Sequence, residues 1–148
     1  MPDDVVVAIG SDVDLVTARA EARAQAVALG FSRTDATLIA TAISEIARNI
    51  IVHAGRGRIA IRGVHETGRH GLVVVAQDEG PGIRDVEAAL QDGHSGRGGF
   101  GLGLPGARRL MDEFKVVSTE DHGTTVTMTK WRVRTRLELL HAQRSHGG

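Results

Sequence analysis

Glu45 and Asn49 lie four residues apart in a stretch with a helical pattern, so their side chains would stand one above the other on one face. The neutral oxygen of an asparagine suits a hard cation such as Mg²⁺, and a glutamate one turn away can polarise a hydroxyl or a water. An exposed polar pair on an amphipathic helix explains this spacing equally well, and taken alone the pair favours that simpler interpretation.

A second group with chemical potential begins at Asp78, which follows a predicted strand and leads into Gly80-Pro81-Gly82. A carboxylate at the end of a strand can accept a hydrogen bond from an exocyclic amine such as that of adenine. Asp78 could instead only start the turn that the glycines and the proline complete. Two glycines around a proline let a flat ring approach the backbone, which favours a base-binding role.

A third group is the glycine cluster Gly99-Phe100-Gly101-Leu102-Gly103, which opens onto a predicted helix with Pro105 in its first turn. Backbone N–H groups at such a helix start form an anion site. A flexible glycine hinge is the simpler interpretation, and both fit if residues 92–98 form a mobile lid over a phosphate cradle.

Two other patterns do not hold up as sites. Residues 101–106 match the Gly-x-Gly-x-x-Gly dinucleotide fingerprint, but loop rather than strand precedes them and too little chain follows for a Rossmann sheet. The histidines show no metal-ligand spacing, and we interpret His53 and His94 as solvated loop residues.

Composition narrows the class of protein. A chain of 148 residues suggests one domain, and 18 basic against 18 acidic residues leave no net charge to attract nucleic acid or a membrane. The absence of cysteine excludes disulfides and thiol chemistry. No apolar run approaches membrane-spanning length, so we expect a cytoplasmic protein.

The elements that must position these groups follow from periodicity and from turn residues. Strands are predicted at Val5–Ile9, Arg58–Arg62, Leu72–Ala76, Phe114–Ser118 and Thr124–Thr129. Helices are predicted from Ser11 or Asp12 to about Leu29, from a Ser32 cap to about His53, from Asp85 to Leu90, and from Pro105 to Met111. This irregular order favours an α+β protein, a two-layer sandwich whose mixed, mostly antiparallel sheet carries helices on one face.

The groups described above, followed by Gly123-Thr124-Thr125, occur in the order of the N, G1, G2 and G3 boxes of the gyrase/Hsp90/histidine-kinase/MutL (GHKL) ATPase superfamily. Within it the chain resembles the RsbT-like switch-protein serine/threonine kinases of the bacterial stressosome, over residues 41–50, 91–93, 101–114 and 123–126. The resemblance covers roughly Val5 to Trp131. We therefore expect an ATP-binding kinase domain at residues 1–131 and a tail at 132–148, either a short helix or disordered.

The resemblance implies a Bergerat-type, histidine-kinase-like ATPase fold that uses ATP and Mg²⁺. It implies that Glu45 is the general base, that Asn49 holds Mg²⁺, and that Asp78 binds the adenine amine with help from the hydroxyl of Thr125. The further nucleotide-binding residues that it implies are Gly80, Gly82, Ile83, Gly99, Gly101, Leu102, Gly103 and Leu104.

The same resemblance implies partners. The acceptor would be a Ser or Thr of a STAS-domain protein, and the released kinase would then bind and activate a PP2C-type phosphatase. Three alternatives stay open: an anti-sigma factor with the same fold, the detached ATPase domain of a histidine kinase, and a nucleotide-gated binding module without catalysis. A homodimer is also open.

Overall fold

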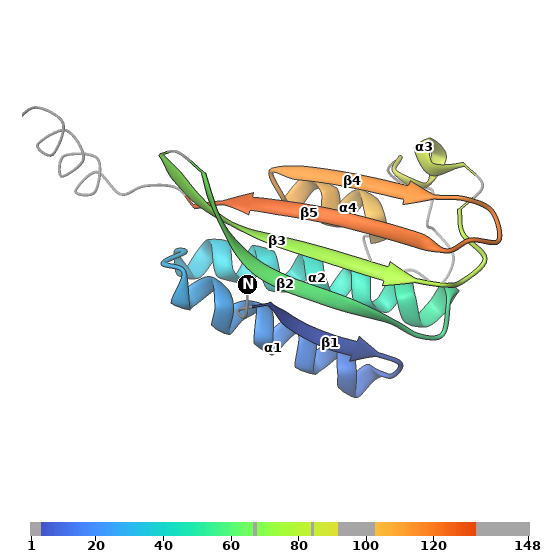
Figure 1. Cartoon of the computed structure of the whole chain (residues 1–148), viewed down its shortest axis with the longest axis horizontal. Coiled ribbons are helices and arrows are strands. Elements are labelled where there is room, and N and C mark those ends of the chain that lie inside the picture. The colour runs from blue at the N-terminus through green and yellow to red at the C-terminus, as the bar shows by residue number, and fades with distance from the viewer. Residues whose placement is uncertain (1–3, 67, 84, 92–102, 133–148) are drawn as a thin grey trace, which may run out of the picture.

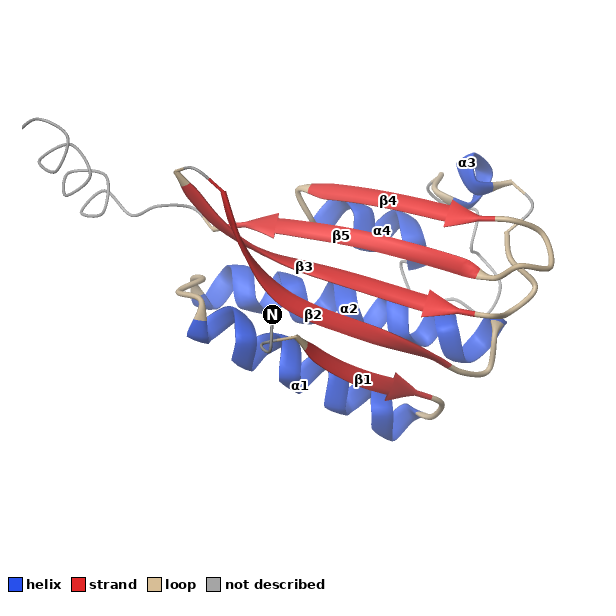
Figure 2. Cartoon of the chain, in the orientation of Figure 1, coloured by secondary structure: helices blue, strands red, loops and turns tan. Residues whose placement is uncertain are grey.

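The computed structural model describes residues 4–66, 68–83, 85–91 and 103–132, which form a five-stranded sheet with helices against one of its faces (Figure 1). The elements in chain order are β1 (Val5–Ile9), α1 (Asp12–Ala28), α2 (Arg33–His53), β2 (Gly57–Glu66), β3 (Arg69–Asp78), α3 (Val86–Ala89), α4 (Gly103–Leu110), β4 (Glu113–Ser118) and β5 (Thr124–Trp131). Figure 2 shows α1, α2 and α4 together behind the strands, which confirms the expected α+β two-layer sandwich. The tail at 133–148 and the expected lid at 92–98 lie outside the described residues.

The sheet has the strand order β1-β2-β3-β5-β4. The sequence predicted a mixed, mostly antiparallel sheet. All four pairings between the described strands are antiparallel, so the described sheet contains no parallel pair. Two helices rather than one separate β1 from β2, so the chain enters β2 in the direction opposite to β1. β5 pairs with β3 although α3, α4 and β4 separate them in the chain, and this pairing sets Asp78 opposite Thr124.

The core lies between the sheet and α2. Alternate residues of each strand face the helices, as in β3, where Leu72, Val74 and Ala76 are all buried. The largest fully buried side chains come from both layers and are Ile9, Ile39, Ile43, Ile46, Ile59, Ile61, Leu72, Val74 and Met128. α2 contacts α1 on one side and α4 on the other, so a well-packed core holds the helix that carries Glu45 and Asn49.

Local signals explain where the helices begin and end. The Ser32 hydroxyl accepts the backbone N–H of Asp35 at 3.0 Å, which confirms the predicted cap of α2. Gly30 follows α1 with a φ of +89°, a conformation that favours glycine. At α3 the Asp85 carboxylate accepts the N–H of Ala88 at 3.0 Å. None of the described helices combines the length and the apolar character needed to cross a bilayer.

The hairpin of β2 and β3 is longer than the sequence predicted. Pairing continues to His65 opposite His70 and to Glu66 opposite Arg69, beyond the apolar centres at Arg58–Arg62 and Leu72–Ala76. These outer residues are polar, so apolar periodicity does not mark them, and the ladder hydrogen bonds extend the strands.

Candidate nucleotide-binding site

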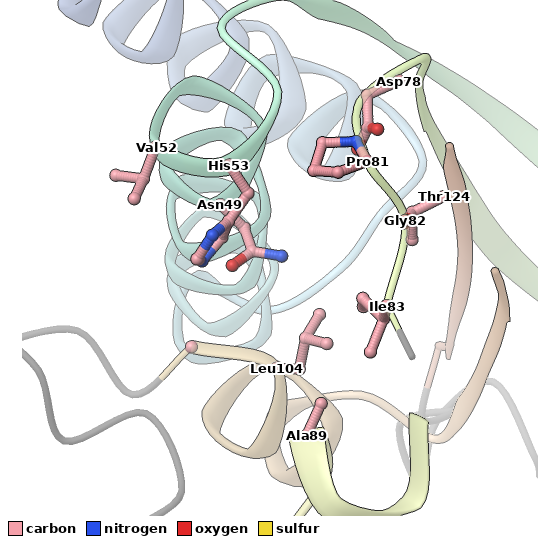
Figure 3. A pocket seen from close by; sticks show the side chains of 11 residues that line it. Asn49, Val52, His53, Asp78, Pro81, Gly82, Ile83, Ala89, Leu104 and Thr124 are labelled. Carbon is pink, nitrogen blue, oxygen red and sulfur yellow. The ribbon is translucent and has the colours of Figure 1, made fainter. Parts of the chain in front are cut away.

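A pocket of about 690 Å³ opens at the end of the sheet where β3 ends and β5 begins (Figure 3). The end of α2, the start of α4, the loop after β3 and α3 surround it. The residues that line it are Asn49, Val52, His53, Asp78, Pro81, Gly82, Ile83, Ala89, Gly103, Leu104 and Thr124. The structure therefore brings together members of all four groups that the sequence placed far apart.

The last turns of α2 supply one wall. Asn49 lines the pocket together with Val52 and His53, which follow three and four residues later on the same side of the helix. His53 is thus an exposed pocket residue at the last position of α2, where the sequence interpretation placed it in a solvated loop. Its spacing of four from Asn49 was the signal that could have identified it.

Asp78 closes the pocket on the side of the sheet, as the last residue of β3. Its Oδ1 accepts the backbone N–H of Gly80 at 2.9 Å. Asp78 therefore does start the turn, as one of the two interpretations predicted. It also lines the pocket, which is compatible with binding a base.

The threonine of this pocket is Thr124, not Thr125. Thr124 is buried, pairs with Asp78 across the ladder and lines the pocket, and its hydroxyl lies 2.9 Å from that of Ser118. Thr125 pairs with Gln77, and because side chains alternate along a strand it belongs to the opposite face of the sheet. The expectation for Thr125 is corrected on this point. The sequence could have shown this, because the apolar residues Val126 and Met128 lie two and four positions after Thr124 and so face the same side of the sheet as Thr124.

The glycines of the loop after β3 are needed first by the protein itself. A Cβ on Gly80 would lie 2.6 Å from the Cβ of Ala54 at the end of α2. A Cβ on Gly82, where φ is +77°, would meet the carbonyl oxygen of Thr119, and one on Gly123 would meet that of Asp78. In this part of the site, the glycines therefore allow close contact between two segments of the protein backbone rather than between the backbone and a ligand.

Ile83 is held beside these glycines. Its backbone N–H donates to the Ser118 hydroxyl at 2.7 Å, and the residue lines the pocket. The Ser118 hydroxyl also donates to the carbonyl of Gly123 at 3.0 Å, which ties the loop after β3 to the turn between β4 and β5.

Glu45 lies one turn before Asn49 on α2 and is almost buried, with 9% of its surface exposed. Its Oε2 accepts the backbone N–H of Gly103, the first residue of α4, at 3.1 Å. Its Oε1 accepts the guanidinium of Arg48 at 3.2 Å. The carboxylate thus joins α2 to the start of α4 beside the pocket, but it is not itself among the lining residues.

The glycine cluster reaches the pocket through its end. Gly103 has a φ of +61° and lines the pocket with Leu104, which is 4% exposed. The three earlier residues expected to bind phosphate, Gly99, Gly101 and Leu102, lie outside the described residues.

The protein oxygens at the pocket fit a Mg²⁺ ion that takes most of its ligands from elsewhere. Among the described residues no group of three or more His, Asp or Glu side chains is arranged to hold a metal. Mg²⁺ bound with nucleotides commonly keeps water and phosphate ligands and takes only one or two from the protein. The amide oxygen of Asn49 in the pocket suits that requirement.

Comparisons with known proteins agree with this geometry. The histidine kinase-like ATPase domain family matches residues 11–130. The serine/threonine-protein kinase RsbT of Bacillus subtilis is 47% identical over 131 residues, which is 88% of this chain and 98% of that protein. An anti-sigma F factor of Caldanaerobacter subterraneus subsp. tengcongensis is 37% identical over 102 residues, 66% of this chain and 71% of that protein.

Solved structures share the fold at low sequence identity. The RsbU and RsbW domains of a Mycobacterium tuberculosis protein superpose with a TM-score of 0.61 at 20% identity, over 90% of this chain and 34% of that one. The Pseudomonas aeruginosa SiaB-SiaC complex contains a chain with a TM-score of 0.52 at 14% identity, over 86% of this chain and 88% of that one. The chain belongs to the histidine kinase-like ATPase family and, within it, is a homologue of the serine/threonine-protein kinase RsbT.

Proposed function

We propose that this chain is an ATP-dependent serine/threonine protein kinase whose acceptor is a STAS-domain protein. We also propose that, once released from its acceptor, it binds and activates a PP2C-type phosphatase. The observation that supports the kinase reaction is the placement of Glu45 and Asn49 on one turn of α2, beside a pocket that Asp78 closes on the other side. The homology to RsbT supports the choice of partners.

The nucleotide would lie across the pocket from sheet to helix. Asp78 would accept the adenine amino group, with the Thr124 hydroxyl beside it. Gly82 and Ile83, which line the pocket, would contact the base, and Gly80 would serve by holding Asp78 through its N–H. The phosphates would extend toward the start of α4, where the cluster of Gly99, Gly101, Leu102, Gly103 and Leu104 offers backbone N–H groups. Asn49 would hold Mg²⁺ through its amide oxygen.

In the reaction the acceptor hydroxyl oxygen would bond to the γ-phosphorus as the bond from that phosphorus to the bridging oxygen of ADP breaks. The hydroxyl proton would pass to the carboxylate of Glu45, and ADP would leave with the bridging oxygen. Mg²⁺ held there would supply charge neutralisation of the phosphate oxygens. The chain's own part is orientation, because Gly103 and Arg48 fix both oxygens of Glu45 before any substrate arrives.

A phosphotransfer assay tests this proposal. The purified chain would be mixed with γ-labelled Mg-ATP and, one at a time, with the STAS-domain proteins of its own genome. We expect transfer to at least one of them, and we expect Glu45→Gln to slow it about 100-fold or more while Mg-ADP still binds. If no STAS-domain protein is labelled, the kinase proposal fails; if Glu45→Gln transfers at the wild-type rate, only the base role fails.

A second candidate is an anti-sigma factor, and the similarity to anti-sigma F factors favours it. Both activities use the same nucleotide site, so the site geometry does not separate them. Direct binding measurements against a purified sigma factor and a purified PP2C-type phosphatase would do so. If the chain is the proposed kinase, we expect it to bind the phosphatase tightly and not to bind the sigma factor.

A further inference from the structure

Arg48 reaches the proposed general base from the same helix. Its Nη1 lies 3.2 Å from Oε1 of Glu45, three residues earlier on α2. The two side chains differ in environment, because 52% of the Arg48 side chain is exposed and only 10% of the Glu45 side chain is. The arginine therefore contacts solvent while its partner lies under the surface.

The carboxylate of Glu45 receives one donor on each oxygen. Arg48 donates to Oε1 and the N–H of Gly103 donates to Oε2. A carboxylate is a planar group that turns as a unit, so a donor that fixes one oxygen also sets the direction of the other. The guanidinium of Arg48 thereby helps to direct Oε2 at the first residue of α4.

The position of this carboxylate makes its charge costly. A nearly buried carboxylate needs charge-assisted hydrogen bonds to replace its hydration. Asn49, one turn further along α2, and Gly103, whose N–H the carboxylate accepts, both line the pocket, so a triphosphate in that pocket would add negative charge nearby. The cation of Arg48 offsets this repulsion and helps to keep Glu45 oriented toward α4.

An ordinary helix ion pair would explain the contact between Arg48 and Glu45 without any such role. The chain contains an exposed ion pair for comparison, Arg69 and Glu66, which face each other in the β2–β3 hairpin rather than on a helix and are also three residues apart, at 3.0 Å. Both members of that pair are about half exposed, and such pairs contribute little. Glu45 differs because it is nearly buried and because its second oxygen accepts a hydrogen bond from another element, the first residue of α4.

We propose that Arg48 is a positioning residue that acts through Glu45 and sets the start of α4. The catalytic consequence rests on the proposed function above, while the structural consequence at Gly103 does not. Loss of the guanidinium lets the carboxylate turn away from Gly103, so that the N–H of Gly103 is less protected and the base is misdirected.

The test uses Arg48→Gln, Arg48→Lys and, as a control for the loss of an ion-paired arginine elsewhere on the surface, Arg69→Gln in the β2–β3 hairpin, where the arginine also stacks on Trp131. The first readout is amide hydrogen exchange at Gly103, followed by NMR in the full chain without nucleotide. We expect exchange about 5-fold faster or more in Arg48→Gln, an intermediate rate in Arg48→Lys, which keeps the charge but not the planar fork, and the wild-type rate in Arg69→Gln. An unchanged rate in Arg48→Gln would overturn the proposal.

The second readout is the rate of phosphotransfer from Mg-ATP to the labelled STAS-domain protein. We expect kcat to fall about 10-fold in Arg48→Gln, with the KM for ATP within about 2-fold of wild type and partial recovery in Arg48→Lys. A rise in KM for ATP at constant kcat would show instead that Arg48 binds the nucleotide directly and would overturn the positioning role. If the wild type transfers no phosphate, the proposed function fails while the exchange measurement still decides the role of Arg48.

Discussion

The carboxylate of Glu45 accepts the backbone N–H of Gly103 across 3.1 Å and so joins the middle of α2 to the first residue of α4. The two residues are 58 positions apart in the chain. This contact gives Glu45 a structural role besides the proposed catalytic one, and a substitution that removes the carboxylate affects both. The choice of replacement therefore decides what an experiment on Glu45 measures.

The two roles of Glu45 can be separated by comparing Glu45→Gln with Glu45→Ala. A glutamine keeps an oxygen that accepts the N–H of Gly103, while an alanine leaves that donor without its partner. We expect Glu45→Ala to lower the free energy of unfolding by about 1 kcal/mol more than Glu45→Gln does. Urea unfolding of the nucleotide-free protein measures this difference, and equal stability of the two variants would show that the contact contributes nothing.

Asp78→Asn should weaken nucleotide binding without disturbing the fold. The asparagine Oδ1 can still accept the N–H of Gly80, so the turn after β3 keeps its hydrogen bond and the melting temperature should hold. The second oxygen becomes an amino group that cannot accept from adenine, so Mg-ADP affinity should fall about 10- to 100-fold. Calorimetric titration measures it, with the neighbouring exposed Glu79→Gln as the charge-matched control. Equal losses in both variants would mean that general charge, rather than contact with the base, is responsible.

Thr124→Val and Thr125→Val test which face of β5 serves the pocket. Valine has nearly the shape of threonine, with a methyl group in place of the hydroxyl, so Thr124→Val also removes the contact with the Ser118 hydroxyl, and the melting temperature of each variant is measured alongside. We expect Thr124→Val to reduce Mg-ADP affinity about 5-fold, the loss of one neutral hydrogen bond, and Thr125→Val to leave it unchanged. An affinity loss confined to Thr125→Val would restore the residue that the sequence first indicated.

Gly82→Ala and Gly55→Ala test whether the glycine at position 82 is required for the stability of the fold in the absence of nucleotide. Both residues have positive φ, but a Cβ on Gly82 would meet the carbonyl of Thr119 while one on Gly55 would meet nothing within 4 Å. We expect Gly55→Ala to cost about 1 kcal/mol through backbone strain alone. Gly82→Ala should cost about 2 kcal/mol more, since the loop after β3 must also move. Thermal unfolding without nucleotide would show this, and equal costs would contradict the crowding at Gly82.

The sequence by itself determined the features that depend on neighbours along the chain. The Ser32 cap of α2, the start of a short helix near Asp85 and the alternation at Arg58–Arg62 in β2 were predictable because hydrogen bonds over three residues and side-chain periodicity are local properties. The order of the glycine and acidic groups also indicated the family before any geometry was known.

Only the tertiary structure decided which of these residues meet. The pairing of β3 with β5 placed Thr124 opposite Asp78 and excluded Thr125 from the pocket, because a shift of one residue moves a side chain to the other face. The packing of α4 against α2 brought Gly103 to Glu45. Composition and residue spacing do not predict such contacts, because the contacts depend on the register and packing of elements that are distant in the chain.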